Sequence, residues 1–339
     1  MKYIQFIVLS ALIAACSPQS KLPKAGDQIV VEKIWDKAPH QAFTDLIRFK
    51  DAWYCTFREA PGHKSGPVGE ARVLRSTDGK NWASVAFFQM KGLDLRDPKL
   101  SIAPGNRLMV LMDVEAYKDD KVASRLPYIS VSTDGTNFSQ PEKSVVDPSI
   151  ATWSDWVWRI TWHKGTGYAI VYQPESVYVL KTKDGKYFEK VSKLNIDGYP
   201  NESTIRFDKN DKMYVMVRRE KEDAMGVLAK SDAPYTTWTM NKMNQRLGGP
   251  NFFVLNDKTL CIGSRYYEMV DGKLTPSTAI FLSDLNGKIY KTIKLPSGGD
   301  TSYPGMVVYE GQLWFSYYSS HEGKTSIYLA KVPLSMLST

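Results

Sequence analysis

The chain lacks the features that mark several common classes of protein. Only three of its 339 residues are cysteine, and Cys55 and Cys261 sit in apolar, strand-like patterns where cysteine serves as a small hydrophobic residue. No His-Glu-x-x-His pair, phosphate-binding glycine loop or nucleophile elbow occurs. These absences argue against a disulfide framework, a metalloprotease, a nucleotide-binding loop and an α/β-hydrolase. We expect neither a metal ion nor an essential cofactor.

The net charge of +8 is spread along the chain as scattered lysines and arginines. Because there is no basic block and no nucleic-acid-binding motif, this charge does not predict a nucleic-acid partner. After the first residues, no apolar run approaches the length that spans a membrane. The charge would favour an anionic substrate if several arginines converged in one walled site, since such a site focuses the electric field.

The N-terminus has the pattern of an export signal. Lys2 precedes an apolar run over residues 3–15, which is too short to cross a membrane as a helix. The run ends in Leu-Ile-Ala-Ala-Cys at residues 12–16, which resembles a bacterial lipobox. The resemblance implies that residues 1–15 are a signal peptide and that Cys16 is acylated.

Residues 16–28 have little to bury and are expected to form a tether. Ser17 stands where an aspartate would retain a lipoprotein in the inner membrane. We therefore expect the lipid to anchor the protein in the outer membrane of a Gram-negative bacterium, on the periplasmic face. Residues 29–339 are expected to form one domain and to act as a monomer.

A repeat with a period of about fifty residues runs through this domain. Residues 76–82 (Ser-Thr-Asp-Gly-Lys-Asn-Trp) and 132–138 (Ser-Thr-Asp-Gly-Thr-Asn-Phe) are nearly the same segment. Asp-Gly between two strand-like runs indicates a hairpin, because glycine takes the positive φ and aspartate hydrogen-bonds its own turn. Weaker copies follow at residues 183–188, 231–238 and 283–290.

Another strand pair joined by turn residues precedes each hairpin. The six turns are Lys50-Asp51, Pro104-Gly105-Asn106, Lys164-Gly165-Thr166-Gly167, Asp208 to Asp211, Asn256-Asp257 and Glu310-Gly311. Four strands repeated at this period predict the blades of a β-propeller. The sixth blade ends after three strands, and residues 29–35 can supply the fourth. The sequence therefore predicts an all-β, six-bladed propeller closed by its N-terminal strand, with no helix of note.

In such a blade the first strand starts, and the second ends, on the same face of the propeller. Polar residues at these two places are expected to crowd around one mouth, where charges are costly unless they are paired or used. The candidates are Arg58, Glu59, His63, Arg96, Asp97, Trp158, Arg159, Glu202, Arg218, Asn251, Arg265, Tyr303 and His321.

The Ser-Thr-Asp-Gly-x-x-aromatic segments resemble degenerate Asp-boxes of the sialidase superfamily, and the resemblance covers essentially the whole mature chain. Residues 200–205 (Pro-Asn-Glu-Ser-Thr-Ile) with Val217-Arg218 are similar to the segment that holds the sialidase glutamate and a carboxylate-binding arginine. Residues 302–305 (Ser-Tyr-Pro-Gly) resemble the segment with the tyrosine nucleophile. The resemblance implies that Glu202 is the base for Tyr303, and that Arg218 and Arg265 clamp a substrate carboxylate.

Two departures from the sialidase pattern bear on the substrate. Sialidases begin the first blade with an arginine, whereas this chain has Thr44-Asp45, which would repel a carboxylate. Their acid is an aspartate in the loop that here reads Phe-Arg-Glu-Ala-Pro-Gly-His-Lys over residues 57–64, so Glu59 or His63 is expected as the acid or base. We therefore expect an acidic glycan other than sialic acid.

Three functions remain open at this point. The leading one is an exo-acting glycoside hydrolase on a glycan that contains a uronic or ulosonic acid. In a polysaccharide lyase, His63 or His321 would take the proton next to a uronate carboxylate while Tyr303 serves as acid. A non-catalytic glycan-binding lipoprotein is the third. The expected substrate contacts are Arg58, Arg96, Asp97, Trp158, Arg159, Arg218, Asn251, Arg265 and His321.

Overall fold

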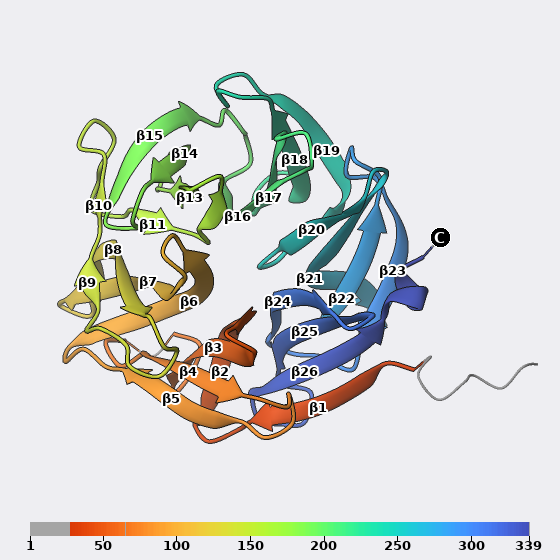
Figure 1. Cartoon of the computed structure of the whole chain (residues 1–339). Helices are drawn as coiled ribbons and strands as arrows, with labels where there is room; N and C mark the ends of the chain where they lie inside the picture. Colours follow the sequence, from red (N-terminus) through yellow and green to blue (C-terminus); the bar gives the residue numbers. More distant parts are fainter. Residues whose placement is uncertain (1–27, 65, 339) are drawn as a thin grey trace, which may run out of the picture.

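The computed structural model describes residues 28–64 and 66–338. These residues form six β-sheets arranged around a central axis (Figure 1). Among them the one helix is a short 3-10 segment, η1 (Leu334–Leu337). The predicted all-β, six-bladed propeller is confirmed. The expected signal peptide and the acylated Cys16 lie outside the described residues, as does the tether up to residue 27.

Four blades are sheets of four consecutive strands, ordered from the axis outward. Blade 1 contains β2 (His40–Phe49), β3 (Ala52–Ala60), β4 (Glu70–Ser76) and β5 (Ala83–Phe88). Blade 2 contains β6 (Leu93–Ala103), β7 (Arg107–Lys118), β8 (Lys121–Ser132) and β9 (Glu142–Lys143). Blade 4 contains β16 (Pro200–Phe207), β17 (Met213–Arg219), β18 (Met225–Ser231) and β19 (Thr239–Arg246). Blade 5 contains β20 (Asn251–Asn256), β21 (Thr259–Val270), β22 (Lys273–Ser283) and β23 (Ile289–Leu295).

Blade 3 differs in its innermost strand, which is broken into two short pieces. Both β11 (Trp156–Val157) and β12 (Thr161–His163) pair with β13 (Thr166–Tyr172). The blade continues through β14 (Val177–Thr182) and β15 (Tyr187–Lys193), and β10 (Val145–Val146) adds a parallel strand at the outer edge.

Blade 6 joins the two ends of the domain. It contains β24 (Thr301–Tyr309), β25 (Gln312–Ser319) and β26 (Ser326–Pro333), and β1 (Val30–Trp35) completes it. The pairing of β1 with β26 is antiparallel, with Val30 opposite Lys331. Ile34 and Trp35 pack against the core between blades 1 and 6. The predicted closure of the ring by the N-terminal strand is confirmed.

The repeated Asp-Gly segments form turns that also contact the preceding blade. In blade 1, the carboxylate of Asp78 accepts hydrogen bonds of 2.8 Å from the backbone N–H groups of Lys80 and Asn81. Gly79 has a φ of 68°, and a Cβ atom there would lie 2.3 Å from the Trp314 ring of blade 6. The repeat thus requires glycine both for the turn and for close packing between blades.

Apolar side chains fill the spaces between neighbouring blades. One cluster joins Met109 and Ile129 of blade 2 to Ala169 and Phe188 of blade 3. The cysteines at positions 55 and 261 are free and buried, as their apolar surroundings in the sequence predict. In the part of the chain that the structure describes, no helix is both long and apolar enough to cross a membrane.

Candidate active site

The innermost strands of four blades are interrupted near their first residues. The register breaks lie between Ala42 and Asp45, Arg96 and Lys99, Pro200 and Ser203, and Ser302 and Gly305. Phe43, Asp97 and Tyr303 lie in three of these breaks and have φ angles of 65°, 46° and 54°. Because β-bulges redirect side chains, and strained backbone concentrates at functional sites, these positions define the candidate site.

The centre of the site is a hydrogen-bonded pair formed by Glu202 and Tyr303. The Tyr303 hydroxyl donates to Oε1 of Glu202 at 2.6 Å. Arg218 Nη1 donates to Oε2 of Glu202 at 2.5 Å and lies 2.9 Å from the Tyr303 hydroxyl oxygen. The backbone N–H of Gly249 donates to the same Oε2 at 3.0 Å. The bulges of blades 4 and 6 therefore bring together two residues that are far apart in the sequence.

The surroundings of this pair keep the proton on the tyrosine. Burial raises the pKa of Tyr303 well above its usual value, and the Glu202 charge raises it further, against the opposing effect of Arg218. Burial alone would raise the pKa of Glu202, but Arg218 and the hydrogen bond from Tyr303 hold it below its usual value. The pair is therefore a neutral phenol next to an ionised carboxylate, which is the arrangement that base-assisted attack by a phenol requires.

A second buried pair, Asp97 and Lys99, lies in the bulge of blade 2. Lys99 Nζ donates to the carbonyl oxygen of Phe43 at 3.2 Å and lies 4.8 Å from the centroid of the Trp158 ring. Burial lowers the pKa of Lys99 to about 8. Burial also raises the pKa of Asp97, against the effect of Lys99, and Oδ1 of Asp97 has no hydrogen-bond partner among the described residues. A buried carboxyl group with an elevated pKa and a free oxygen is suited to donate a proton.

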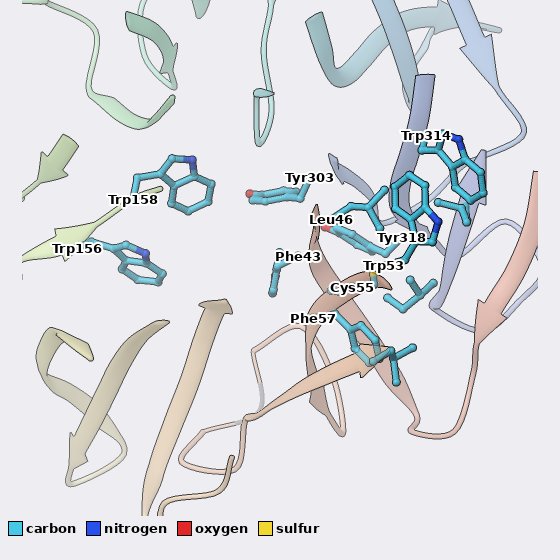
Figure 2. Packing of buried hydrophobic residues seen from close by; sticks show 14 residues of the cluster. Phe43, Leu46, Trp53, Cys55, Phe57, Trp156, Trp158, Tyr303, Trp314 and Tyr318 are labelled. Atoms are coloured by element: carbon cyan, nitrogen blue, oxygen red, sulfur yellow. The ribbon is translucent and has the colours of Figure 1, made fainter. Parts of the chain in front are cut away.

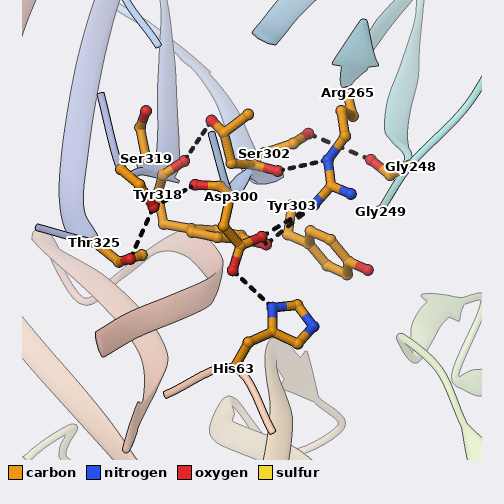
Figure 3. A network of polar contacts seen from close by, with 12 residues as sticks. His63, Gly248, Gly249, Arg265, Asp300, Ser302, Tyr303, Tyr318, Ser319 and Thr325 are labelled. Atoms are coloured by element: carbon orange, nitrogen blue, oxygen red, sulfur yellow. Dashed lines mark hydrogen bonds and ion pairs between the residues drawn. The ribbon is translucent and has the colours of Figure 1, made fainter. Parts of the chain in front are cut away.

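Arg265 and Asp300 form a third group beside the tyrosine (Figure 3). Arg265 donates through Nε to the carbonyl oxygen of Thr301 at 2.9 Å, and its Nη2 lies 3.4 Å from Oδ1 of Asp300. The other carboxylate oxygen of Asp300 lies 2.6 Å from His63 Nδ1 and 3.0 Å from His40 Nε2. Blades 1, 5 and 6 therefore meet at this carboxylate.

Aromatic rings surround Tyr303 and fix its position. Figure 2 shows the ring near Trp158, Phe43 and Tyr318. The centroids of Phe43 and Trp158 lie 5.0 and 6.1 Å from that of Tyr303, both with the edge-to-face geometry that aromatic pairs prefer. Trp158 is 1% exposed, so it has no free face on which a sugar could stack. Its expected role as a substrate contact is therefore corrected to support of the Tyr303 ring.

The structure keeps Arg58 and Glu59 out of this centre. Both side chains are buried in ion pairs within the first two blades. Arg58 donates to both carboxylate oxygens of Asp94, at 2.8 and 2.9 Å, and is 0% exposed. Glu59 accepts hydrogen bonds from Trp35 and Arg72. Neither is free to contact a substrate or to transfer a proton, because its polar atoms are already used.

Arg159 and Asn251 face the other end of the axis. Arg159 forms a buried ion pair with Asp45, the residue that stands near the expected first arginine. Asn251 accepts a hydrogen bond from Arg206 and donates to the carbonyl oxygen of Pro304. Both residues line a pocket of about 280 Å³ together with residues toward the far ends of the inner strands. The expectation that they contact the substrate is corrected, since they stabilise the opposite end of the propeller.

Two further candidates lie at the edge of the site. Arg96 is held by Asp94 and Glu115 at 3.3 and 3.7 Å, and its guanidinium group lies 5.6 Å from the Phe43 ring centroid. His321, in the loop after β25, contacts Ser319 and packs beside Tyr328, away from Tyr303. The structure therefore groups Glu202, Tyr303, Arg218, Arg265, Asp97 and His63, and leaves His321 outside.

Several residues of the site carry no signal in the sequence. The missed residues are Phe43, Lys99, Gly249, Asp300 and Tyr318. They lie outside the repeated segments, and their proximity depends on contacts between different blades.

Comparison with known proteins identifies the fold. No protein-family model matches the sequence, and no curated protein is similar to it. A protein of unknown function from Dyadobacter fermentans has a similar structure, with a TM-score of 0.75 at 16% identity over 90% of this chain and 99% of that one. An α-L-arabinofuranosidase from Fusarium graminearum gives a TM-score of 0.60 at 14% identity, over 88% of this chain and 94% of the enzyme.

The sialidase of Trypanosoma rangeli is similar at a TM-score of 0.66 and 11% identity. The match covers 87% of this chain but only 55% of the sialidase, so this chain spans about half of that protein. The TM-scores establish the architecture, whereas identities this low leave the substrate open. In architecture, the chain is a six-bladed β-propeller of the sialidase type.

Proposed function

We propose that the protein is a glycoside hydrolase that acts on an acidic glycan, with Tyr303 as the nucleophile and Glu202 as its base. The observation that carries this proposal is the 2.6 Å hydrogen bond from the Tyr303 hydroxyl to Glu202. A phenol is a weak nucleophile at neutral pH, and it becomes effective when an adjacent carboxylate accepts its proton. Tyrosine nucleophiles are a known exception to glycosidase chemistry based on two carboxylates.

In the proposed first step, the Tyr303 oxygen attacks the anomeric carbon while Glu202 accepts the phenolic proton. The bond from this carbon to the leaving-group oxygen breaks, and Asp97 donates a proton to that oxygen. In the second step, Asp97 takes a proton from water, which attacks the same carbon and releases Tyr303. The phenolate then recovers its proton from Glu202, and both carboxyl groups return to their starting states.

Asp97 suits the acid role better than the two residues expected from the sequence. Its Oδ1 has no hydrogen-bond partner among the described residues and burial raises its pKa, whereas Glu59 is fixed between Trp35 and Arg72. His63 directs Nδ1 at Asp300. Asp97 also lies close enough for its charge to affect both Glu202 and Tyr303.

The charge around Tyr303 favours an acidic substrate. Arg218 lies 2.9 Å from the phenolic oxygen, and the Arg265 guanidinium group lies 5.7 Å from the ring centroid. Guanidinium groups can form bidentate hydrogen bonds to a carboxylate. Arg218 also pairs with Glu220, and Arg265 with Asp300, so a substrate carboxylate would share or replace these contacts. A pocket of about 300 Å³ near Tyr199, formed by loops at the same end of blades 3 and 4, supports binding of further sugar units.

The test is to incubate the purified protein with a panel of acidic oligosaccharides and to measure product masses. Hydrolysis adds the mass of water, and reaction in H₂¹⁸O labels the released sugar. We expect Glu202→Gln and Tyr303→Phe to lower kcat/KM by at least about 10²-fold, the lower range for loss of a catalytic proton transfer. Glu189→Gln and Tyr187→Phe, on the exposed outer strand β15, are the matched controls and are expected to retain activity.

Two results would contradict the proposal. Products that lack added water and absorb ultraviolet light would indicate a lyase. Binding of a glycan without turnover by the parent protein, unchanged in the Glu202 and Tyr303 variants, would indicate a binding module.

A further inference from the structure

Three metal-ligating side chains from distant parts of the sequence meet beside the proposed active site. His40 begins β2, His63 lies in the loop after β3, and Asp300 precedes β24. One ligand atom from each, His40 Nε2, His63 Nδ1 and Asp300 Oδ2, lies within 4.8 Å of the other two. Asp300 Oδ2 is 3.0 Å from the His40 nitrogen and 2.6 Å from the His63 nitrogen.

We propose that His40, His63 and Asp300 bind one divalent first-row transition-metal ion such as Zn²⁺. Two imidazole nitrogens and one carboxylate oxygen are a donor set used by catalytic zinc and non-haem iron sites. Such ligands lie about 2.0–2.2 Å from the metal, so neighbouring donor atoms are roughly 3–3.5 Å apart. The two distances to Asp300 need to open by less than about 1 Å, which the loop position of His63 allows.

The surroundings of Asp300 fix the carboxylate in a ligating orientation. Its other oxygen, Oδ1, accepts a hydrogen bond of 2.8 Å from the Tyr318 hydroxyl and lies 3.4 Å from Arg265 Nη2. These contacts leave Oδ2 directed at His63, as Figure 3 shows. The same oxygen lies 3.0 Å from His40 Nε2. Support of a ligating carboxylate by outer hydrogen bonds is a general property of metal sites.

Solvent reaches the cluster from one side. The side chain of His63 is 42% exposed and that of Asp300 is 26% exposed, whereas that of His40 is 9% exposed. An ion held by these three groups would therefore keep a coordination position for water or a substrate oxygen. The positive charge of Arg265 opposes a cation, so we expect weaker binding than at a closed structural zinc site.

The proposed ion departs from the sequence-based expectation of a site without metal. It would lie on the Arg265 side of Tyr303, where it could bind an anionic group or hydroxyl of the substrate. The proposal concerns metal binding itself, and it does not depend on the hydrolase assignment.

The chain offers a matched control for nonspecific binding of metal by histidine. His163 lies 2.9 Å from the carboxylate of Asp211, but this pair includes no second histidine. It therefore has the same histidine–carboxylate contact without the third ligand.

The test is isothermal titration of the metal-stripped protein with ZnCl₂, and absorption spectroscopy with CoCl₂. We expect one ion per chain with a Kd below about 10 μM, and d–d bands of cobalt bound to nitrogen and oxygen. His63→Ala and Asp300→Asn are each expected to weaken binding by at least about tenfold, the smaller loss seen when an outer partner of a ligand is removed. His163→Ala is expected to bind like the parent.

The proposal would be overturned if the folded parent bound no zinc in this range, or if the His163 variant alone lost binding. Far-UV circular dichroism of each variant checks folding. His63→Ala is the more informative variant because His63 is exposed, whereas His40 is buried and its replacement can disturb β2. If the parent protein bound zinc but turned over no glycan, the result would count against the hydrolase proposal alone.

Discussion

At the residue scale, the proposed chemistry depends on the contacts of Glu202 with three neighbours. Tyr303 and Arg218 contact it through side chains, and Gly249 contributes a backbone N–H. A carboxylate held in this way keeps a fixed lone pair directed at the phenol, which reduces the reorganisation that proton transfer requires. The glycine is part of this arrangement because any larger residue would contact the tyrosine ring.

Gly249→Ala tests this packing. Gly249 has a φ of 58°, and a Cβ atom there would lie 2.4 Å from a Tyr303 ring carbon. We expect kcat to fall by at least about tenfold, because displacement of a reacting group by as little as 1 Å can cost more than that. The control is Gly272→Ala, which has a similar φ of 74° but open space around it. Equal activity of the two variants would show that contact with Tyr303 does not matter.

The Glu202 carboxylate also makes the stability of the protein depend on pH. Its pKa is lower in the folded chain than the value of about 4.3 in an unfolded chain, so the unfolded state binds more protons between the two values. The stabilisation is complete above about pH 4.3 and is lost as the pH falls through the folded pKa. We expect Glu202→Gln to unfold more easily than the parent at about pH 6, with a difference that shrinks toward about pH 3. Chemical denaturation across this range measures the effect, and a constant difference would refute it.

At the scale of strands and turns, the sequence predicts the hairpins well because their signals are local. Asp-Gly requires a positive φ and a side-chain acceptor within a few residues, as at Asp78 and Gly79, and the same segment repeats in successive blades. The bulge at Ser302 to Gly305 has no comparable signature. It is stabilised by contacts across blades, such as the hydrogen bond from Thr44 to the carbonyl oxygen of Tyr303.

The residues of the candidate site show the same difference between local signals and contacts across blades. Resemblance of short segments was sufficient to select Glu202, Arg218 and Tyr303, which the structure brings into contact. The strand-end rule also selected Arg58 and Arg159, because it locates residues along a strand but cannot show which of them already has a buried partner. Asp94 and Asp45 supply those partners from other strands.

Removal of β1 tests the closure of blade 6. A chain that starts at residue 37 loses the partner of β26 and the apolar contacts of Ile34 and Trp35. We expect it to lose at least about 3 kcal/mol of stability, the value of one or two buried apolar side chains, and to aggregate through its exposed edge. Thermal unfolding and light scattering measure both effects. A chain that starts at residue 28 is the control, and equal stability of the two would contradict a structural role for β1.

For the whole molecule, we propose that acylation of Cys16 anchors the propeller in the outer membrane, facing the periplasm. The lipid would hold the protein at the membrane surface, while the propeller itself remains in the aqueous phase.

Cys16→Ser tests the anchor. We expect the variant protein to lose labelling by radioactive palmitate and to move from the detergent phase to the aqueous phase in Triton X-114 partition. Cys55→Ser is the control for the label, since Cys55 is buried in β3. A parent protein that carries no lipid would refute the anchor without affecting the proposals for Tyr303 or for metal binding.

The strand that completes blade 6 is the first strand of the domain to be synthesised, and its partner is the last. Val30 pairs with Lys331, so β1 has no strand partner until almost the entire chain exists. Pairing between such distant segments slows folding, and it leaves sheet edges unpaired until β26 has been synthesised. We therefore expect a chain cut short before β26 to leave blade 6 incomplete and its sheet edges exposed. Only a chain translated through β26 can therefore form the closed ring.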